Sequence, residues 1–317
     1  MQEDVNFLDN IIEFGQLTPL SMQETVITIG NFDGVHLGHR AIITKMVTDA
    51  SPMQKPVLVV TFYPNPVDFF NPQRKSFYLS TPWEKKAQLC ALGVDDVITF
   101  KFDRNFANLS AQTFLETLKI KLGLRELIVG HDFALGKNRV GTLPVIKEIG
   151  QKLSFSVRVI DQICIGQEEI SSTQVRQKLD EGDVVGAAQL LGRFYGVSGK
   201  AIHGSARGAR IGLPTANITH WSKKKLPAVG VYATHTILKN HSYQGITNVG
   251  YRPTFEQQEQ PNVETHLFDF NKDIYGEHIE IQFVQKIRDE QKFSGVSDFL
   301  AQIERDKESA RGIFSHA

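Results

Sequence analysis

The stretch GNFDGVHLGH, residues 30–39, lies between a short β-prone run, VITI at residues 26–29, and a helical pattern that follows it. Apolar side chains recur at helical spacing from residue 42 to residue 50. A glycine-rich turn between a strand and a helix directs free backbone N–H groups and the helix dipole at one point, which favours an anion such as phosphate. His36 and His39 add donors that suit a charged triphosphate transition state. The stretch therefore predicts a nucleotide site.

The alternation of strand and helix patterns continues through the first half of the chain. The run VLVVTF at residues 57–62 is almost continuously apolar, as in a strand buried on both faces of a parallel sheet. Further strands are expected at residues 97–100, 127–129 and 156–160, with helices at residues 81–93, 110–123 and 142–153. Repeated βαβ units predict a doubly wound parallel sheet, with ligands at the carboxyl ends of its strands.

The pattern changes in the second half of the chain. Short β-rich runs follow one another with turn residues but no helices between them, at residues 230–238, 243–249, 263–270 and 278–285. This spacing predicts an antiparallel barrel, and an amphipathic helix at residues 294–311 follows it. We therefore expect an α/β protein with two domains, residues 1–187 and residues 188–317.

Composition narrows the classes of function. A length of 317 residues suffices for two separate cores. Lys and Arg together number 35, as do Asp and Glu, so no basic excess points to nucleic acid as a partner. The first ten residues lack a signal-peptide core, and no apolar run reaches membrane-spanning length. Cys90 and Cys164 show no metal or redox spacing, so we expect reduced thiols in a cytoplasmic protein. From the absence of a long apolar run we expect no membrane partner.

Three motifs of the first half suit phosphate and flavin binding, although each has a structural alternative. The histidine turn could be a glycine turn with two incidental surface histidines. In ISSTQVR, residues 170–176, consecutive hydroxyls can simply cap a helix, but Arg176 opposes the helix dipole unless it reaches a phosphate. In GHDF, residues 130–133, Asp132 can hold a ligand hydroxyl or a magnesium ion, and Phe133 can stack on a flat ring. An Asx turn with a buried phenylalanine is the alternative there.

The second half carries a glycine-rich loop and an isolated carboxylate. In GARIGLPTAN, residues 208–217, the glycines let the backbone approach phosphates, and Thr215 and Asn217 offer neutral oxygen ligands to Mg²⁺. A plain hairpin connection is the alternative. Glu264 alternates with apolar neighbours along a strand, where a carboxylate can act as a general base or simply face solvent. Arg288 lies in a stretch that is also compatible with an ordinary charge run.

Together these motifs resemble those of the bacterial bifunctional riboflavin kinase/FAD synthetase family. The resemblance extends over nearly the whole chain and includes LLGRFY, GVYA, NVGYRPTF and ETHLFDF, at residues 190–195, 230–233, 248–255 and 264–270. It implies an N-terminal FMN adenylyltransferase domain and a C-terminal riboflavin kinase domain built as a six-stranded barrel. The implied reactions are riboflavin + ATP → FMN + ADP and FMN + ATP → FAD + pyrophosphate, with Mg²⁺ and with ATP as co-substrate.

The resemblance also implies roles for individual residues. Glu264 would deprotonate the ribityl 5′-hydroxyl in the kinase. Charge during adenylyl transfer would be stabilised by His36, His39 and Arg176. The residues implied to bind ATP, FMN or riboflavin are Gly30, Asn31, Asp33, Gly38, Asp132, Phe133, Ser171, Ser172, Thr173, Gly208, Gly212, Pro214 and Arg288. Thr215 and Asn217 would bind Mg²⁺ and the ATP phosphates.

Some positions depart from the family's usual pattern, namely Asn65, His131, Ala134, Gln174 and Ala209. None of them removes a proposed base or metal ligand. They do suggest a first alternative, in which the chain keeps one activity and its other half is a scaffold or a regulatory flavin site. A protein that binds flavins without turnover is a second alternative, against which the intact base and charge stabilisers argue. A third is a nucleotidyltransferase acting on a coenzyme A precursor, which leaves the barrel unexplained. We expect a monomer or a weak homo-oligomer.

Overall fold

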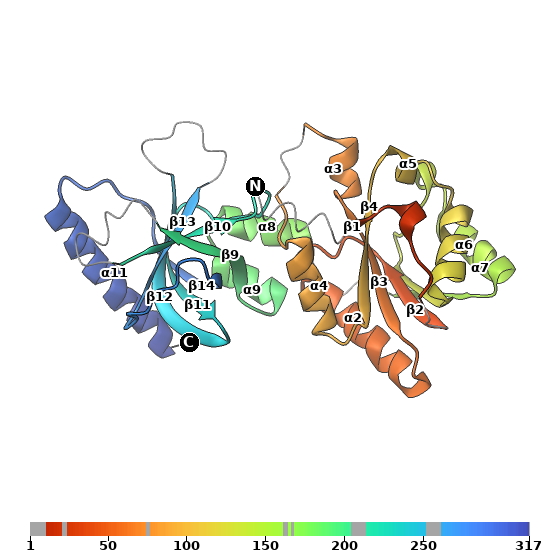
Figure 1. The fold of residues 1–317 in the computed structure, drawn as a ribbon, viewed down its shortest axis with the longest axis horizontal. Coiled ribbons are helices and arrows are strands. Elements are labelled where there is room, and N and C mark those ends of the chain that lie inside the picture. The colour runs from red at the N-terminus through yellow and green to blue at the C-terminus, as the bar shows by residue number, and fades with distance from the viewer. Residues whose placement is uncertain are drawn as a thin grey trace. The chain divides into compact units, whose positions relative to one another are not determined.

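Two sheets of different construction organise the chain. The computed structural model describes residues 11–20, 24–73, 77–160, 164–165, 168–203, 214–251 and 261–316. Packing contacts group the chain into two compact units, residues 1–171 and residues 172–317. A parallel sheet organises the first unit and a closed barrel the second (Figure 1).

The sheet of the first unit has six parallel strands in the order β1-β4-β3-β2-β5-β6. They are β1 (Ile11–Ile12), β2 (Thr25–Ile29), β3 (Val57–Tyr63), β4 (Asp96–Lys101), β5 (Leu124–Gly130) and β6 (Ser156–Ile160). The chain runs from β2 to β3 and β4 on one side and then returns to place β5 on the other side of β2. This reversal creates a topological switch point at the carboxyl ends of β2 and β5, where doubly wound sheets bind ligands.

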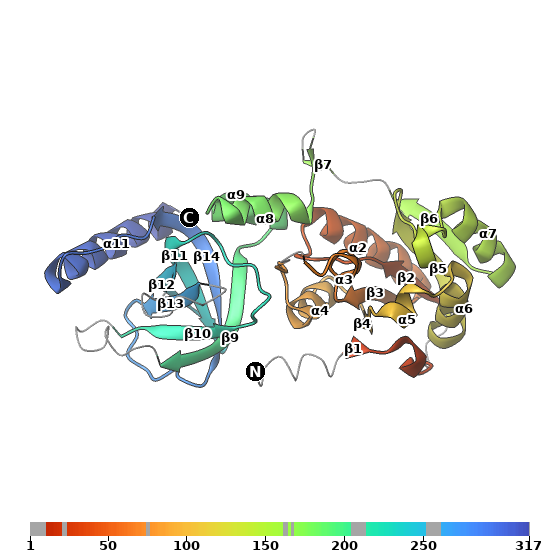
Figure 2. The same cartoon turned by 90° about the horizontal axis from the view of Figure 1, so that it is seen from above.

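Helices cover both faces of this sheet (Figures 1 and 2). One face carries α2 (Leu37–Ala50) and α4 (Pro82–Cys90), whose apolar side chains pack with Val59 and Ile128 of the strands. The other carries α6 (Ala111–Leu122) and α7 (Leu143–Leu153), which pack with Ile27 and Leu127. Shorter elements complete the unit: η1 (Phe14–Gln16), η2 (Ser51–Met53), α3 (Pro66–Phe70), α5 (Arg104–Ala107), η3 (Lys137–Arg139), β7 (Cys164–Ile165) and β8 (Glu168–Glu169).

The second unit contains a closed antiparallel barrel in the order β10-β13-β12-β11-β14-β9. Its strands are β9 (Tyr195–His203), β10 (Ala216–His220), β11 (Gly230–Leu238), β12 (His241–Gly250), β13 (Asn262–Leu267) and β14 (His278–Arg288). Its helices are α8 (Ser172–Asp180), α9 (Val184–Leu191) and α11 (Val296–His316). α9 packs against β9 and β14, and α11 packs against β11, β12 and β14.

The doubly wound parallel sheet and the six-stranded antiparallel barrel with its terminal helix are both confirmed. The strand predicted at residues 263–270 ends at Leu267, because the chain turns at Asp269, which has a left-handed φ of +52°. The domain boundary expected after residue 187 falls inside α9 and stays a prediction about the functional domains. Within the described part of the chain, no helix combines the length and the apolar character needed to cross a membrane.

Candidate active sites

The histidine turn connects β2 to α2 at the switch point of the first unit. His36 is buried at the N-cap position of α2, and His39 lies on the first turn of that helix. Their imidazole rings stack with centroids 3.6 Å apart and an interplanar angle of 22°. Phe32 meets the His39 ring edge-on, with centroids 5.1 Å apart. The two histidines therefore form one packed pair at a helix N-terminus, where the dipole favours an anion.

Burial keeps His39 uncharged in the free protein. Its Nδ1 atom is buried and has no hydrogen-bond partner among the residues that the structure describes. Burial first, and then the charges of His36 and Lys85, lower the pKa of His39 well below its ordinary value. A neutral imidazole carries one N–H donor, so His39 can donate to a phosphate oxygen without being protonated first.

The backbone of the histidine turn is strained and is held by other segments. Phe32 and Val35 have φ values of +48° and +39°, a region that is costly for residues with a Cβ atom. The buried carboxylate of Asp33 accepts hydrogen bonds from the backbone N–H groups of Leu79 and Ser80, at 3.2 and 3.1 Å. Asp33 thus anchors the turn to the loop that precedes α4.

A buried lysine holds the same turn from α4. Lys85 is 4% exposed, and its Nζ atom donates to the backbone carbonyl of Asn31 at 2.6 Å and to the Thr61 hydroxyl at 3.2 Å. Burial lowers the pKa of Lys85 to about 8. A buried ammonium is costly. Its place beside the turn therefore indicates that Lys85 either fixes the backbone of the turn or contributes positive charge to the site.

The glycines of the turn permit close packing. A side chain on Gly30 would lie 3.0 Å from the Phe32 ring, and one on Gly38 would lie 3.2 Å from Nδ1 of His36. The same position on Gly38 is 3.6 Å from the backbone carbonyl of Ile170. The start of the ISSTQVR segment, and with it Ser171, therefore lies beside the histidine turn.

The rest of that segment forms the start of α8. Ser172, Thr173 and Arg176 lie on this helix, which belongs to the second unit. Their predicted action on the same triphosphate as the histidine turn stays a prediction.

The GHDF segment follows β5, the strand next to β2. Asp132 is exposed, and its backbone carbonyl accepts a hydrogen bond from Arg139 at 3.1 Å. Phe133 is partly buried and packs against the core of the first unit. The segment thus lies at the carboxyl edge expected for a ligand, while the stacking role of Phe133 and the ligand role of Asp132 stay predictions.

The second candidate site lies where β10 meets β13. Asn217 and Glu264 are opposite each other in the antiparallel ladder. The Thr215 hydroxyl donates a hydrogen bond to the Glu264 carboxylate, and the Asn262 amide donates to the Asn217 side-chain oxygen. Alternate residues of β13 are buried, with Glu264 on the less buried face, as the sequence pattern predicted.

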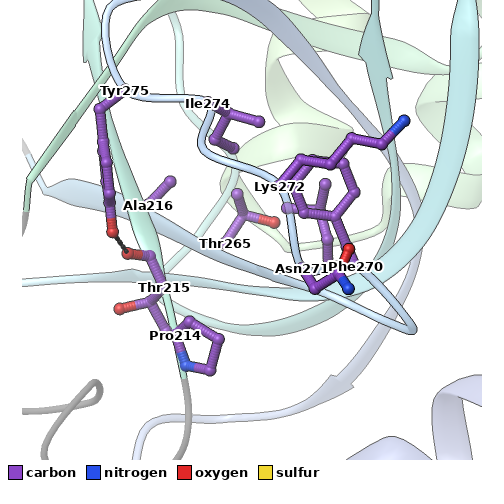
Figure 3. Close-up of a pocket in the computed structure, with 10 residues that line it drawn as sticks. Pro214, Thr215, Ala216, Thr265, Phe270, Asn271, Lys272, Ile274 and Tyr275 are labelled. Atoms are coloured by element: carbon purple, nitrogen blue, oxygen red, sulfur yellow. Dashed lines mark hydrogen bonds between the residues drawn. The ribbon is translucent and has the colours of Figure 1, made fainter.

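A pocket with a volume of about 190 Å³ adjoins Thr215 (Figure 3). It is lined by Pro214, Thr215, Ala216, Thr265, Leu267, Phe270, Asn271, Lys272, Ile274 and Tyr275. Figure 3 shows the Tyr275 hydroxyl directed at the Thr215 backbone carbonyl, to which it donates at 3.1 Å. On the other side of the segment, Nδ1 of His266 bonds the Pro214 carbonyl at 2.8 Å.

Of the other predicted residues of this half, the structure describes the contacts of Arg288 but not the glycines of the loop before Pro214. Arg288 binds the carboxylate of Asp306 on α11 through Nε and Nη2, at distances from 2.7 to 3.1 Å. Its guanidinium therefore fastens the end of β14 to α11, and its predicted contact with the flavin stays a prediction. Gly208 and Gly212 fall outside the part of the chain that the structure describes.

Sequence reasoning did not single out Lys85, Asn262, His266 or Tyr275. For Lys85 a signal existed, because a lysine in the first turns of a helix opposes the dipole. For His266 the signal was its position two residues after Glu264 on the same strand face. Asn262 and Tyr275 act on residues more than forty positions away, and no local pattern reports such contacts.

Comparisons with known proteins assign the two halves of the chain to two different family models. Residues 18–174 match the FAD synthetase family model, and residues 191–314 match the riboflavin kinase family model. A protein of Escherichia coli (strain K12), named bifunctional riboflavin kinase/FMN adenylyltransferase, is 38% identical over 94% of this chain and 95% of its own length. The protein of the same name from Bacillus subtilis (strain 168) is 36% identical over 92% and 93%. A crystal structure from Streptococcus pneumoniae, named as a macrolide-efflux protein, is 30% identical with a TM-score of 0.83 and covers 93% of this chain and 99% of its own.

Proposed function

The chain belongs to the bifunctional riboflavin kinase/FMN adenylyltransferase family, and we propose that its two halves divide the two reactions between them. The chain phosphorylates riboflavin to FMN and adenylylates FMN to FAD, with ATP as the donor in both reactions. Glu264 would act in the first reaction and the histidine pair in the second. The observation that supports this division best is the hydrogen bond between Thr215 and Glu264 beside a pocket in the kinase half.

In the kinase half, Glu264 would be the general base. It would take the proton of the ribityl 5′-hydroxyl while that oxygen forms a bond to the γ-phosphorus of ATP and the bond to ADP breaks. The pocket beside Thr215 has an aromatic ring at Phe270 and another at Tyr275. Such walls suit a flat base, and the polar Thr215 end suits phosphates.

Magnesium fits the donors of this half. The Thr215 hydroxyl gives its proton to Glu264, which leaves its lone pairs able to face a cation. The Asn217 side-chain oxygen, which accepts from Asn262, is a neutral oxygen of the type that Mg²⁺ prefers as a ligand. Mg²⁺ is usually held by one or two protein oxygens together with substrate phosphates; when bound, it would neutralise charge on the phosphates.

In the adenylyltransferase half, the FMN phosphate is already a competent nucleophile. One of its oxygens would form a bond to the α-phosphorus of the second ATP as the bond to pyrophosphate breaks. The protein then needs only to position the reactants and stabilise charge. His36 and His39 would do so from the α2 N-terminus, with Ser171 beside them and with Ser172, Thr173 and Arg176 completing the phosphate contacts. Asn31, Asp132 and Phe133 would contact FMN, the nucleotide or its metal.

We also propose that the protein acts in the cytoplasm as a monomer or a weak homo-oligomer, and that the functional domains meet near residue 187. Size-exclusion chromatography with light scattering tests the oligomeric state. Fragments 172–317 and 188–317 test the boundary. The shorter fragment lacks α8 and half of α9. If it still phosphorylates riboflavin, the boundary near residue 187 is supported; if only the longer fragment does so, the kinase domain includes these helices.

Reciprocal variants test the division of labour. Glu264→Gln should slow FMN formation by about a hundredfold or more, the usual scale for loss of a general base, and leave FAD formation from supplied FMN unchanged. His39→Ala should slow FAD formation by about a hundredfold and leave FMN formation unchanged. Glu277→Gln, at a partly exposed carboxylate of the same unit that is paired with Lys239, is the matched control and should keep both rates. Loss of both activities in either variant would contradict the division.

A further inference from the structure

Two side chains hold successive backbone carbonyls of the segment that carries Thr215. Nδ1 of His266 lies 2.8 Å from the Pro214 carbonyl oxygen, and the Tyr275 hydroxyl lies 3.1 Å from the Thr215 carbonyl oxygen. Because a carbonyl only accepts, both side chains must donate. His266 therefore carries a proton on Nδ1.

These contacts fix the backbone dihedrals of Thr215. The Pro214 carbonyl sets the plane of the peptide before Thr215, and the Thr215 carbonyl sets the plane of the peptide after it. Between the two planes lie only the φ and ψ angles of Thr215. With both angles fixed, the Cα–Cβ bond has one direction, and the hydroxyl reaches the Glu264 carboxylate.

The sheet itself does not provide this restraint. The described pairing of β10 begins at Ala216, which pairs with Thr265 and His203, so Pro214 and Thr215 precede the ladder. Proline also lacks an N–H group, so the carbonyl is the only backbone hydrogen-bonding group of Pro214.

Both donors are themselves well placed. His266 lies two residues after Glu264 on the same face of β13, so one strand carries the carboxylate and a support for its partner. Tyr275 stacks on His203 at the end of β9, with ring centroids 3.5 Å apart and an interplanar angle of 30°. Burial lowers the pKa of His266, against the opposing effect of its hydrogen bond to the Pro214 carbonyl.

We propose that His266 and Tyr275 are positioning residues of the riboflavin kinase site, which orient the Thr215 hydroxyl toward Glu264 by holding the carbonyls of Pro214 and Thr215. The inference rests on the proposed roles of Thr215 and Glu264. It assigns neither residue a contact with the reacting atoms.

Substitutions at His266 distinguish its two ring nitrogens. An asparagine amide can donate from the place of Nδ1, whereas a glutamine amide donates from nearer the place of Nε2. In the full-length chain, His266→Ala and His266→Gln should lower kcat/KM for ATP in riboflavin phosphorylation by about fivefold to tenfold, the effect of one hydrogen bond. Both should also raise the Mg²⁺ concentration needed for half-maximal rate. His266→Asn should stay within about twofold of wild type, and Tyr275→Phe should lower kcat/KM for ATP by about fivefold.

Controls separate positioning from folding and from the proposed function. His241→Ala removes a similar histidine–carbonyl contact, at 3.0 Å to Lys239, on an exposed hairpin of the same barrel and should leave the kinetics unchanged. In every variant, the KM for riboflavin, the rate of FAD formation from FMN and the Tm should equal the wild-type values. Wild-type kinetics in His266→Ala and Tyr275→Phe, equal impairment of His266→Asn and His266→Ala, or losses that follow Tm would each overturn the proposal. Failure of the proposed function itself is distinct, because Glu264→Gln would then retain kinase activity.

Discussion

The imidazole of His39, whose Nδ1 atom is buried, links chemistry to stability. Its pKa lies well below the ordinary value in the folded chain, chiefly because the ring is buried, whereas the unfolded chain should titrate near pH 6.5 (about the model-peptide value). As pH falls below about 6.5, the unfolded state therefore binds a proton that the folded state does not. The free energy of unfolding must decrease as pH falls through that window.

This linkage gives a prediction for His39→Asn. The variant should lose less stability than wild type between about pH 7.5 and pH 5.5, a window chosen around the unfolded pKa of histidine. Urea unfolding at the two pH values measures the difference. Equal losses in the two proteins would contradict a depressed pKa at His39.

Lys85 supplies a second prediction at the residue scale. Lys85→Met removes a costly buried ammonium but also takes a donor from the Asn31 carbonyl and the Thr61 hydroxyl, so these opposing effects should leave the free energy of unfolding little changed. FAD formation should nevertheless fall by about tenfold or more, because hydrogen bonds from a charged group such as that to the Asn31 carbonyl contribute about 1.5–3 kcal/mol. Lys86→Met on the exposed side of the same helix is the control. A destabilised variant with full FAD formation would contradict a functional role for Lys85.

At this scale the sequence predicts residues that act through local patterns. The histidines of the glycine turn and Glu264 on its alternating strand face were recognisable because their neighbours form a pattern. Lys85 and Tyr275 hold backbone atoms 54 and 60 positions away along the chain. Such contacts depend on how elements pack, and composition or spacing does not reveal them.

Among the elements, α11 depends on a buried ion pair with the barrel. Asp306 is 1% exposed and receives hydrogen bonds from Arg288 and Gln302. Asp306→Ala would leave the mostly buried guanidinium unpaired and should destabilise the second unit by about 3–5 kcal/mol. Hydrogen exchange of α11 and urea unfolding measure the effect, and Glu308→Ala, exposed on the same helix, should have none. Unchanged exchange in α11 would show that the pair does not hold this helix.

Elements with explicit end signals were predictable, and elements set by packing were less so. A capping box between Thr81 and Glu84 marks the start of α4, and α6 ends at Gly123 with a φ of +67°. The two-residue β1 was not predicted, because it exists only by pairing with β4. The short α3 also went unpredicted; the side chain of Asn65 caps it by accepting from the Val67 N–H group at 3.0 Å.

For the whole molecule, each of the two units has a candidate site of its own. The sheet order puts the histidine turn and the GHDF segment on adjacent strands, β2 and β5. The barrel brings Glu264 beside Thr215 and Asn217, although Glu264 lies 49 positions from Thr215 along the chain. Fold class was predictable from periodicity, since repeated βαβ units and closely spaced strands each permit few architectures. The pairing of β10 with β13 was not predictable, because these strands are not consecutive in the sequence and become neighbours only when the barrel closes.

The time course of riboflavin, FMN and FAD in one reaction measures both proposed activities and their order. Purified full-length protein is mixed with riboflavin, ATP and Mg²⁺, and the three flavins are separated by chromatography at successive times. We expect FMN to appear first and FAD to follow, with ADP released in proportion to riboflavin phosphorylation and pyrophosphate in proportion to FAD formation. FMN that accumulates without FAD would contradict an active adenylyltransferase half, and formation of neither product would contradict the assignment of both sites.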